Sequence, residues 1–134
     1  MSHIIETKKA PSAIGPYVQG INIGNLVFTS GQIPVNPQNG ETPDDVVKQA
    51  RLSLENVKAI VEAAGLEVND IIKTTVFLSD MNDFSFINQA YKQFFDEHKA
   101  NYPARSCVQV ARLPKDVKIE IEAIAATPNT SACR

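Results

Sequence analysis

The chain has 134 residues, enough for one domain, and 43% of them are apolar, as in ordinary globular proteins. Its net charge of −2 and pI of about 5.6 offer no attraction for a polyanion, so we expect no nucleic-acid partner. The N-terminus lacks an apolar secretory core, and no apolar run approaches the ~18 residues of a membrane span. Two cysteines, Cys107 and Cys133, do not make a disulfide framework. We therefore expect a cytoplasmic protein with no membrane partner.

The first part of the chain is predicted to form strands. A short strand is expected at Ile4–Glu6. Tyr17–Ile23 and Leu26–Ser30 flank the dipeptide Gly24-Asn25, a turn of the kind that closes a β-hairpin.

A first helix is predicted from apolar residues that recur at spacings of three and four, namely Val46, Ala50, Leu54, Val57, Val61 and Ala64. Thr42 is its expected N-cap, Pro43 suits the first helical position, and Asp45 lies where a capping-box partner would. Gly65 is the expected left-handed stop.

A second helix is predicted to begin near Asn82 or Asp83 and to end before Pro103. Its apolar face carries Phe84, Ile87, Tyr91 and Phe94. Three further strands are expected, at Asp70–Ser79, Arg105–Ala111 and Val117–Ala126, and the last two are predicted to form a hairpin across the turn RLPKD.

This order of elements predicts an α+β fold, with one mixed sheet and both helices packed on one face. Residues 1–127 would form the single domain, and 128–134 a frayed C-terminal tail. One chain of this length cannot also cover the second face of the sheet. We therefore expect that face to meet another subunit or a ligand.

The final predicted hairpin holds the candidate chemistry. Side chains alternate across a strand, so Arg105 and Cys107 share one face, and Glu120 and Glu122 share one face of the next strand. A register that matches polar with polar residues places these four side chains next to one another on the uncovered face. One interpretation is a set of solvated cross-strand ion pairs. The other is a site in which Arg105 binds a ligand carboxylate and a glutamate holds or deprotonates a water.

The segment YPARSCVQVARLPKDVKIEIEAIA closely resembles the C-terminal signature of the Rid family, the YjgF-like reactive-intermediate imine deaminases. Three other blocks match in the right order, AIGPYVQG, VFTSGQIP and IIKTTVFLSDMNDF, so the resemblance spans Ile4 to Ala126. One departure is PYVQ, where many members have PYSQ; it bears on the breadth of substrates.

The resemblance implies a homotrimer of chorismate-mutase-like subunits, with the helices outside and pockets between subunits. It implies hydrolysis of short 2-imino acids, 2-iminobutanoate and 2-iminopropanoate, to 2-keto acids and ammonia, with no metal or organic cofactor. Arg105 would bind the substrate carboxylate, the backbone of Cys107 would contact the imine, and Glu120 would position the attacking water. The implied substrate-binding residues also include Tyr17, Ser30, Gly31 and Asn88.

Other interpretations stay open at this point. Tyr17 could be a turn aromatic and Asn88 a solvated amide, while Cys107 has no base nearby and is interpreted as a pocket wall rather than a nucleophile. A trimeric sensor of 2-keto acids would need Arg105 but not Glu120. An RNA-directed endoribonuclease or translation inhibitor is a third possibility, which the acidic pI does not favour.

Overall fold

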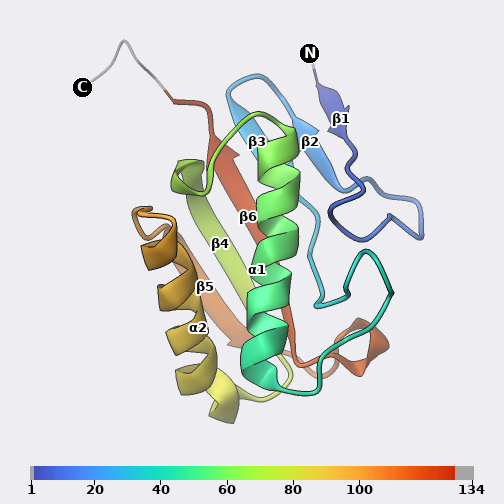
Figure 1. Cartoon of the computed structure of the whole chain (residues 1–134), viewed down its shortest axis with the longest axis vertical. Coiled ribbons are helices and arrows are strands. Elements are labelled where there is room, and N and C mark those ends of the chain that lie inside the picture. Colours follow the sequence, from blue (N-terminus) through green and yellow to red (C-terminus); the bar gives the residue numbers. More distant parts are fainter. Residues whose placement is uncertain (1, 129–134) are drawn as a thin grey trace.

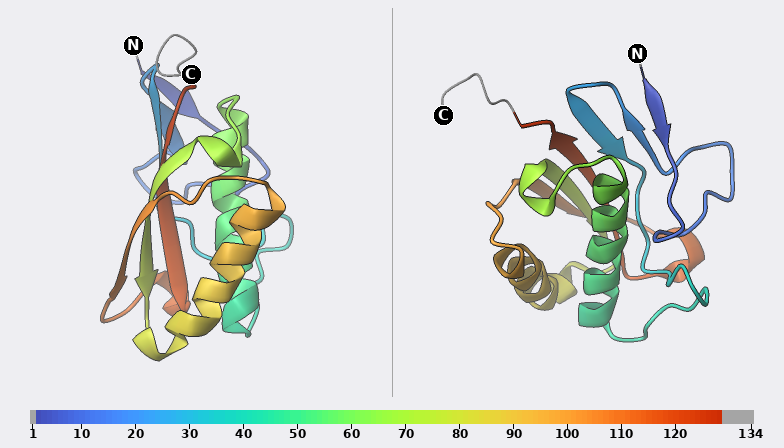
Figure 2. Two further views of the ribbon diagram at one scale, coloured as in Figure 1. Left: turned by 90° about the vertical axis from the view of Figure 1, so that its left-hand side faces the viewer. Right: turned by 45° about the horizontal axis from the view of Figure 1, so that its top comes forward.

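The computed structural model describes residues 2–128 and contains one six-stranded mixed sheet in the order β1-β2-β3-β6-β4-β5 (Figure 1). Both helices cover the same face of the sheet, and no other part of residues 2–128 covers the opposite face, called the bare face below (Figure 2). The predicted α+β class and layer arrangement are thus confirmed. The elements are β1 His3–Ile5, β2 Gly20–Asn22, β3 Leu26–Thr29, α1 Val46–Ala63, β4 Ile71–Leu78, α2 Phe84–Glu97, β5 Ala104–Gln109 and β6 Ile119–Ala126.

The hydrophobic core lies between the sheet and the two helices. Its fully buried side chains come from both layers and include Leu54, Ile60, Val76, Phe94, Phe95, Ile119 and Ile121. Within residues 2–128, no helix is both long and apolar enough to cross a membrane. The predicted tail at 128–134 lies outside the described residues, apart from Pro128.

Helix α1 begins later than predicted. Asp45, not Thr42, is the N-cap, and its carboxylate accepts a hydrogen bond of 3.0 Å from the Lys48 amide. A carboxylate three residues before that amide satisfies one of the free N–H groups of the first turn, so Thr42 and Pro43 remain in the preceding loop. The predicted stop is confirmed: Gly65 has φ +85°, and the Gly65 and Leu66 amides bond back to the last turn.

The bounds of helix α2 agree closely with the prediction. A 3-10 turn at Met81–Asp83 leads into the helix, which ends at Glu97, before Pro103. The hairpin of β2 and β3 is also confirmed, with Gly24 at φ +105° in the turn. Strand β2 starts at Gly20 rather than Tyr17, since the preceding loop is held by the buried amide of Gln19. That amide bonds the backbone of residues 7, 10 and 11.

The predicted final hairpin is wrong. Strand β4 lies between β5 and β6, parallel to β5 and antiparallel to β6 (Figure 1). The physical reason is the β4–α2–β5 crossover: a helix that joins two strands of one sheet delivers the second strand parallel to the first. The segment between Gln109 and Ile119 then carries the chain past β4 to its other side.

The predicted faces change with this strand order. Arg105 pairs with Thr74 of β4, and Thr74 is buried beneath α2, so Arg105 and Cys107 lie on the helix-covered face. Glu120 pairs with Phe77 and Glu122 with Thr75, which puts both carboxylates on the bare face, as expected. The expectation that Arg105 and Cys107 lie beside these carboxylates is therefore incorrect. Local alternation fixes which residues share a face of one strand, but not which face meets the core.

Candidate active site

The predicted site residues fall into two groups within one chain. Arg105, Cys107 and Asn88 form an arginine group at the β5 edge and α2. Tyr17, Ser30, Gly31 and Glu120 form a glutamate group around the ends of β2, β3 and β6. The two groups lie on opposite faces of the sheet.

The arginine group presents a guanidinium with free donors. Arg105 Nη1 donates a 2.9 Å hydrogen bond to Asn88 Oδ1, and within residues 2–128 its other N–H groups have no hydrogen-bond partner. They face a hollow of about 400 Å³ lined by Asn88, Tyr91, Lys92, Tyr102, Pro103 and Arg105. A planar fork of this kind matches both oxygens of a carboxylate. Asn88 is thus a partner of Arg105 rather than only a solvated amide.

Cys107 is a half-buried wall of the arginine group. Burial raises the pKa of its thiol, and the nearby Arg105 charge lowers it by a smaller amount. The thiol is therefore protonated at neutral pH, and only the thiolate is a strong nucleophile. This supports the interpretation of Cys107 as a wall group.

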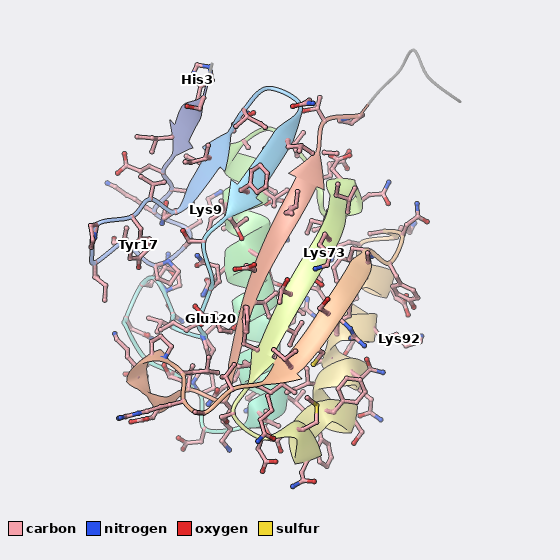
Figure 3. The ribbon with its side chains drawn as sticks, turned by 180° about the vertical axis from the view of Figure 1, so that it is seen from behind. His3, Lys9, Tyr17, Lys73, Lys92 and Glu120 are labelled. Atoms are coloured by element: carbon pink, nitrogen blue, oxygen red, sulfur yellow. The ribbon has the colours of Figure 1, made fainter. Side chains whose placement is uncertain are left out.

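The glutamate group lies on the bare face. Figure 3 shows that face from the front, with Glu120 on β6 and Tyr17 on the loop before β2. The Tyr17 side chain is about half exposed, and Ser30 Oγ donates to the Val18 carbonyl at 2.5 Å. Beside Tyr17 and Gly31, a second hollow of about 220 Å³ is walled by apolar side chains, among them Ile14, Ile33 and Val35.

Glu120 has the electrostatic character of a base. Burial raises the pKa of its carboxyl group, and repulsion from Glu122 raises it further. Within residues 2–128, no hydrogen-bond donor offsets this effect at the carboxylate. A half-buried carboxylate without a donor is poised to take a hydrogen bond from a water and then its proton.

Gly31 leaves the space that the Glu120 carboxylate occupies. A Cβ at Gly31 would overlap Glu120 Oε2 and lie 2.8 Å from Glu120 Cδ. The backbone at Gly31 is not in the left-handed region, so an alanine there brings no strain of its own.

We predict that Gly31→Ala folds normally but displaces the Glu120 carboxylate, because the atom it meets is the end of a flexible side chain. Any reaction that uses the Glu120 carboxylate should slow at least about tenfold, since a misplacement of about 1 Å can cost far more than that. Steady-state rates and the melting temperature would measure the two effects. Gly40→Ala, at a site with no atom within 4 Å, is the control for a loop glycine, although its φ of +75° brings a cost in stability. A fully active Gly31→Ala protein would show that the position of Glu120 is not critical.

One chain cannot bring Arg105 and Glu120 to the same small molecule. Strands in a sheet are about 4.8 Å apart, so β5 and β6 are separated by ~10 Å, and the two side chains also point to opposite faces. A site that uses both residues must therefore draw them from two copies of the chain.

Two further contacts of the arginine group were not predicted. The Arg105 Cζ atom lies 4.8 Å from the centroid of the Tyr91 ring and 5.5 Å from that of Phe84. The sequence pattern identified both aromatics only as members of an apolar stripe. Together with Asn88 they recur at helical spacing on α2, a signal that would have placed them on one face with Arg105.

The fold and these groups define a small α+β protein with an arginine at the sheet edge whose free donors match the geometry of a carboxylate. The pattern of the family described as Endoribonuclease L-PSP matches residues 7–127, and the chain belongs to this family, also called Rid or YjgF. It is 70% identical over 125 residues to the 2-iminobutanoate/2-iminopropanoate deaminase of Escherichia coli, covering 93% of this chain and 98% of that one. The Salmonella typhimurium protein of the same description is 68% identical, with the same coverage.

Among solved structures, the fold resembles that of E. coli TdcF with bound serine. The TM-score is 0.93 at 74% identity, and the match covers 94% of this chain and 99% of TdcF. The predicted membership of the Rid family is thus confirmed.

Proposed function

We propose that the chain hydrolyses short 2-imino acids, with 2-iminobutanoate and 2-iminopropanoate as substrates, to 2-keto acids and ammonia. The observation that carries the proposal is the Arg105 fork, held by Asn88 with its other donors free to bind a carboxylate. The half-buried Glu120 supplies a base, and the relatives that carry the same description are about 70% identical. Serine bound to TdcF supports a small ligand with a carboxylate.

The proposed reaction needs only water and a proton carrier. Arg105 holds the substrate carboxylate, and Glu120 accepts a proton from a water whose oxygen attacks C2 of the C=N bond. The imine nitrogen takes up a proton, which gives a carbinolamine. The nitrogen then takes a second proton, the C–N bond breaks, and ammonia leaves as the C2 hydroxyl loses its proton to become the keto group. Tyr17, Ser30 and Gly31 line the pocket, and the Cys107 backbone contacts the reacting nitrogen.

The proposed active unit is a homotrimer. The bare face carries a row of exposed or half-buried apolar side chains across neighbouring strands, namely Ile4, Ile21, Phe28 and Ile124. Apolar surface of this extent is usually covered. In a closed head-to-tail ring, the arginine group of one copy meets the glutamate group of the next. The expected mass is about three times 14.6 kDa.

A sensor of 2-keto acids is the main alternative. The glutamate group argues against it. A site that only binds a 2-keto acid gains no affinity from a carboxylate, because the carboxylate repels the negative charge of the ligand. The RNA-directed alternative is opposed by the same residues, because Glu120 and Glu122 on the bare face would repel the phosphates of an RNA. We expect the enzyme to act in the cytoplasm.

A coupled assay tests the activity. A dehydratase generates 2-iminobutanoate in the presence of this protein, and the release of 2-ketobutyrate is followed against spontaneous hydrolysis. Faster release supports the proposal. Binding of 2-ketobutyrate without any acceleration would instead establish the sensor.

A mixing experiment tests the shared site. Arg105→Ala and Glu120→Gln proteins, each expected to lose most of its turnover, are unfolded together and refolded as mixed trimers. If each site takes Arg105 from one copy and Glu120 from its neighbour, about one quarter of the sites regain both residues. The mixture should then recover about a quarter of the turnover of wild type refolded in the same way, whereas each variant refolded alone should stay at its own low rate. No recovery in the mixture, with full recovery of wild type, would show that Arg105 and Glu120 do not act in one shared site.

A further inference from the structure

We propose that Tyr91 is a positioning residue for Arg105, and that its ring, with that of Phe84, holds the guanidinium in the plane in which it receives the substrate carboxylate. The inference rests on the proposed function, since it concerns the same arginine. It assigns a task to a buried aromatic residue that would otherwise be explained by core packing alone.

The two rings flank the guanidinium along the axis of α2. Phe84 and Tyr91 are seven residues apart, which separates them by ~10 Å along a helix. Their ring centroids nevertheless lie only 5.5 Å and 4.8 Å from Arg105 Cζ, so the guanidinium is between them. Asn88, one turn after Phe84, accepts the hydrogen bond from Nη1 at the same place. Three contacts from one helix therefore define the position of the fork.

The Tyr91 ring is itself held in place by contacts with β4 and α2. Its hydroxyl shares a 2.6 Å hydrogen bond with Thr74 Oγ1, and both side chains are buried. Phe95 packs against the same ring with centroids 4.8 Å apart. Burial raises the pKa of the Tyr91 phenol, so the ring is neutral and attracts Arg105 through its π face rather than through a charge.

Thr74 and Arg105 are direct partners in the β4–β5 ladder. The Tyr91 hydroxyl is thus bonded to the residue next to Arg105, and the ring lies under the arginine head. A flexible arginine loses rotamer freedom when it binds a ligand, and a platform that removes this freedom in advance improves affinity. A carboxylate held equally in the ground and transition states changes KM rather than kcat.

The test compares two double variants that differ only in the ring. Thr74→Val with Tyr91→Phe removes both hydroxyls but keeps the aromatic ring, and removing both partners of a buried hydrogen bond costs little stability. Thr74→Val with Tyr91→Leu removes the ring as well. We call these double variants the phenylalanine pair and the leucine pair. The leucine pair should have a KM, and a Kd for 2-ketobutyrate, about 3- to 30-fold higher than the phenylalanine pair, with kcat within about twofold.

Phe84→Leu is a second test that does not disturb the core, because Phe84 is 36% exposed. It should raise the same two constants about two- to fivefold, in line with an exposed cation–π contact. Equal KM and Kd in the two double variants would overturn the inference. If the double variant with Tyr91→Leu does not fold, an unchanged KM in Phe84→Leu would overturn it instead. A fall in kcat alone would also overturn it, because that is the result of a structural defect that lowers the fraction of active protein.

Arg105→Ala separates the two hypotheses. If it abolishes 2-ketobutyrate binding while all aromatic variants bind normally, the proposed function stands and only the role of Tyr91 is wrong. If Arg105→Ala binds the keto acid as well as the wild type does, the carboxylate site itself is wrong.

Discussion

Replacing Glu120 by Gln is expected to slow imine hydrolysis by about 10²–10⁴-fold, the usual contribution of a positioned general base. Glutamine has nearly the same shape, so the space beside Gly31 stays filled and the proposed trimer should persist. Binding of 2-ketobutyrate should remain, because the product lacks the reacting C=N bond. The coupled assay and a titration with 2-ketobutyrate measure the two properties. Equal turnover in wild type and Glu120→Gln would remove Glu120 from the mechanism.

The pH profile gives an independent check on Glu120. The base must be ionised, so activity should be present above its pKa in the folded protein and be lost as the pH falls through that value. Because burial and Glu122 both raise this pKa, the acid limb should lie above the ordinary pKa of a glutamate.

Glu122→Gln is the matched control, since it lies two residues along the same strand on the same face. It should keep the rate at neutral pH. It should also move the acid limb to lower pH, because the repulsion that raises the pKa of Glu120 is gone. An acid limb that does not respond to Glu122→Gln would belong to a different group.

Features that depend only on residues close in the sequence are predictable from it. The stop at Gly65 and the turn at Gly24 follow from positive φ, which glycine adopts without a Cβ penalty. The apolar stripe of α2 was found because helical periodicity is a local signal. The N-cap of α1 was misplaced because Thr42 and Asp45 both suit that position, and only the packing of the first turn decides between them.

Strand order is not a local property, and there the prediction failed. The segment RLPKD resembles a hairpin loop, yet β4 comes between the two strands that it joins. Nothing in the alternation of β5 or β6 shows that β4 will pair with both. Once β4 is placed, its register assigns Arg105 to the helix-covered face through Thr74.

The identities of the site residues came from the family resemblance, and their separation came from the fold. Arg105 and Asn88 meet within one chain, because both line the seam between β5 and α2. Glu120 cannot join them there, since a sheet lies between. A site that draws on two copies, as proposed, cannot be predicted from patterns within one chain, because its geometry would depend on the symmetry of the assembly.

Arg105→Lys separates the geometry of this cation from its charge. Lysine keeps the positive charge but loses the planar fork and has about three donors in place of about five, and it stacks less well against Tyr91 and Phe84. Bidentate carboxylate binding predicts a loss of about 1.5–3 kcal/mol in substrate binding, or roughly 10- to 150-fold in KM. Arg105→Ala should lose at least as much, and both variants should keep the mass of the proposed trimer.

The two outcomes for Arg105→Lys have different meanings. If lysine restores most of the activity that alanine loses, Arg105 acts through its charge alone, and the aromatic platform has no task. If lysine is as poor as alanine in the titration with 2-ketobutyrate, the fork is required. Asn88→Ala should then show a smaller loss of the same kind, because it removes the side-chain oxygen that accepts the hydrogen bond from Nη1.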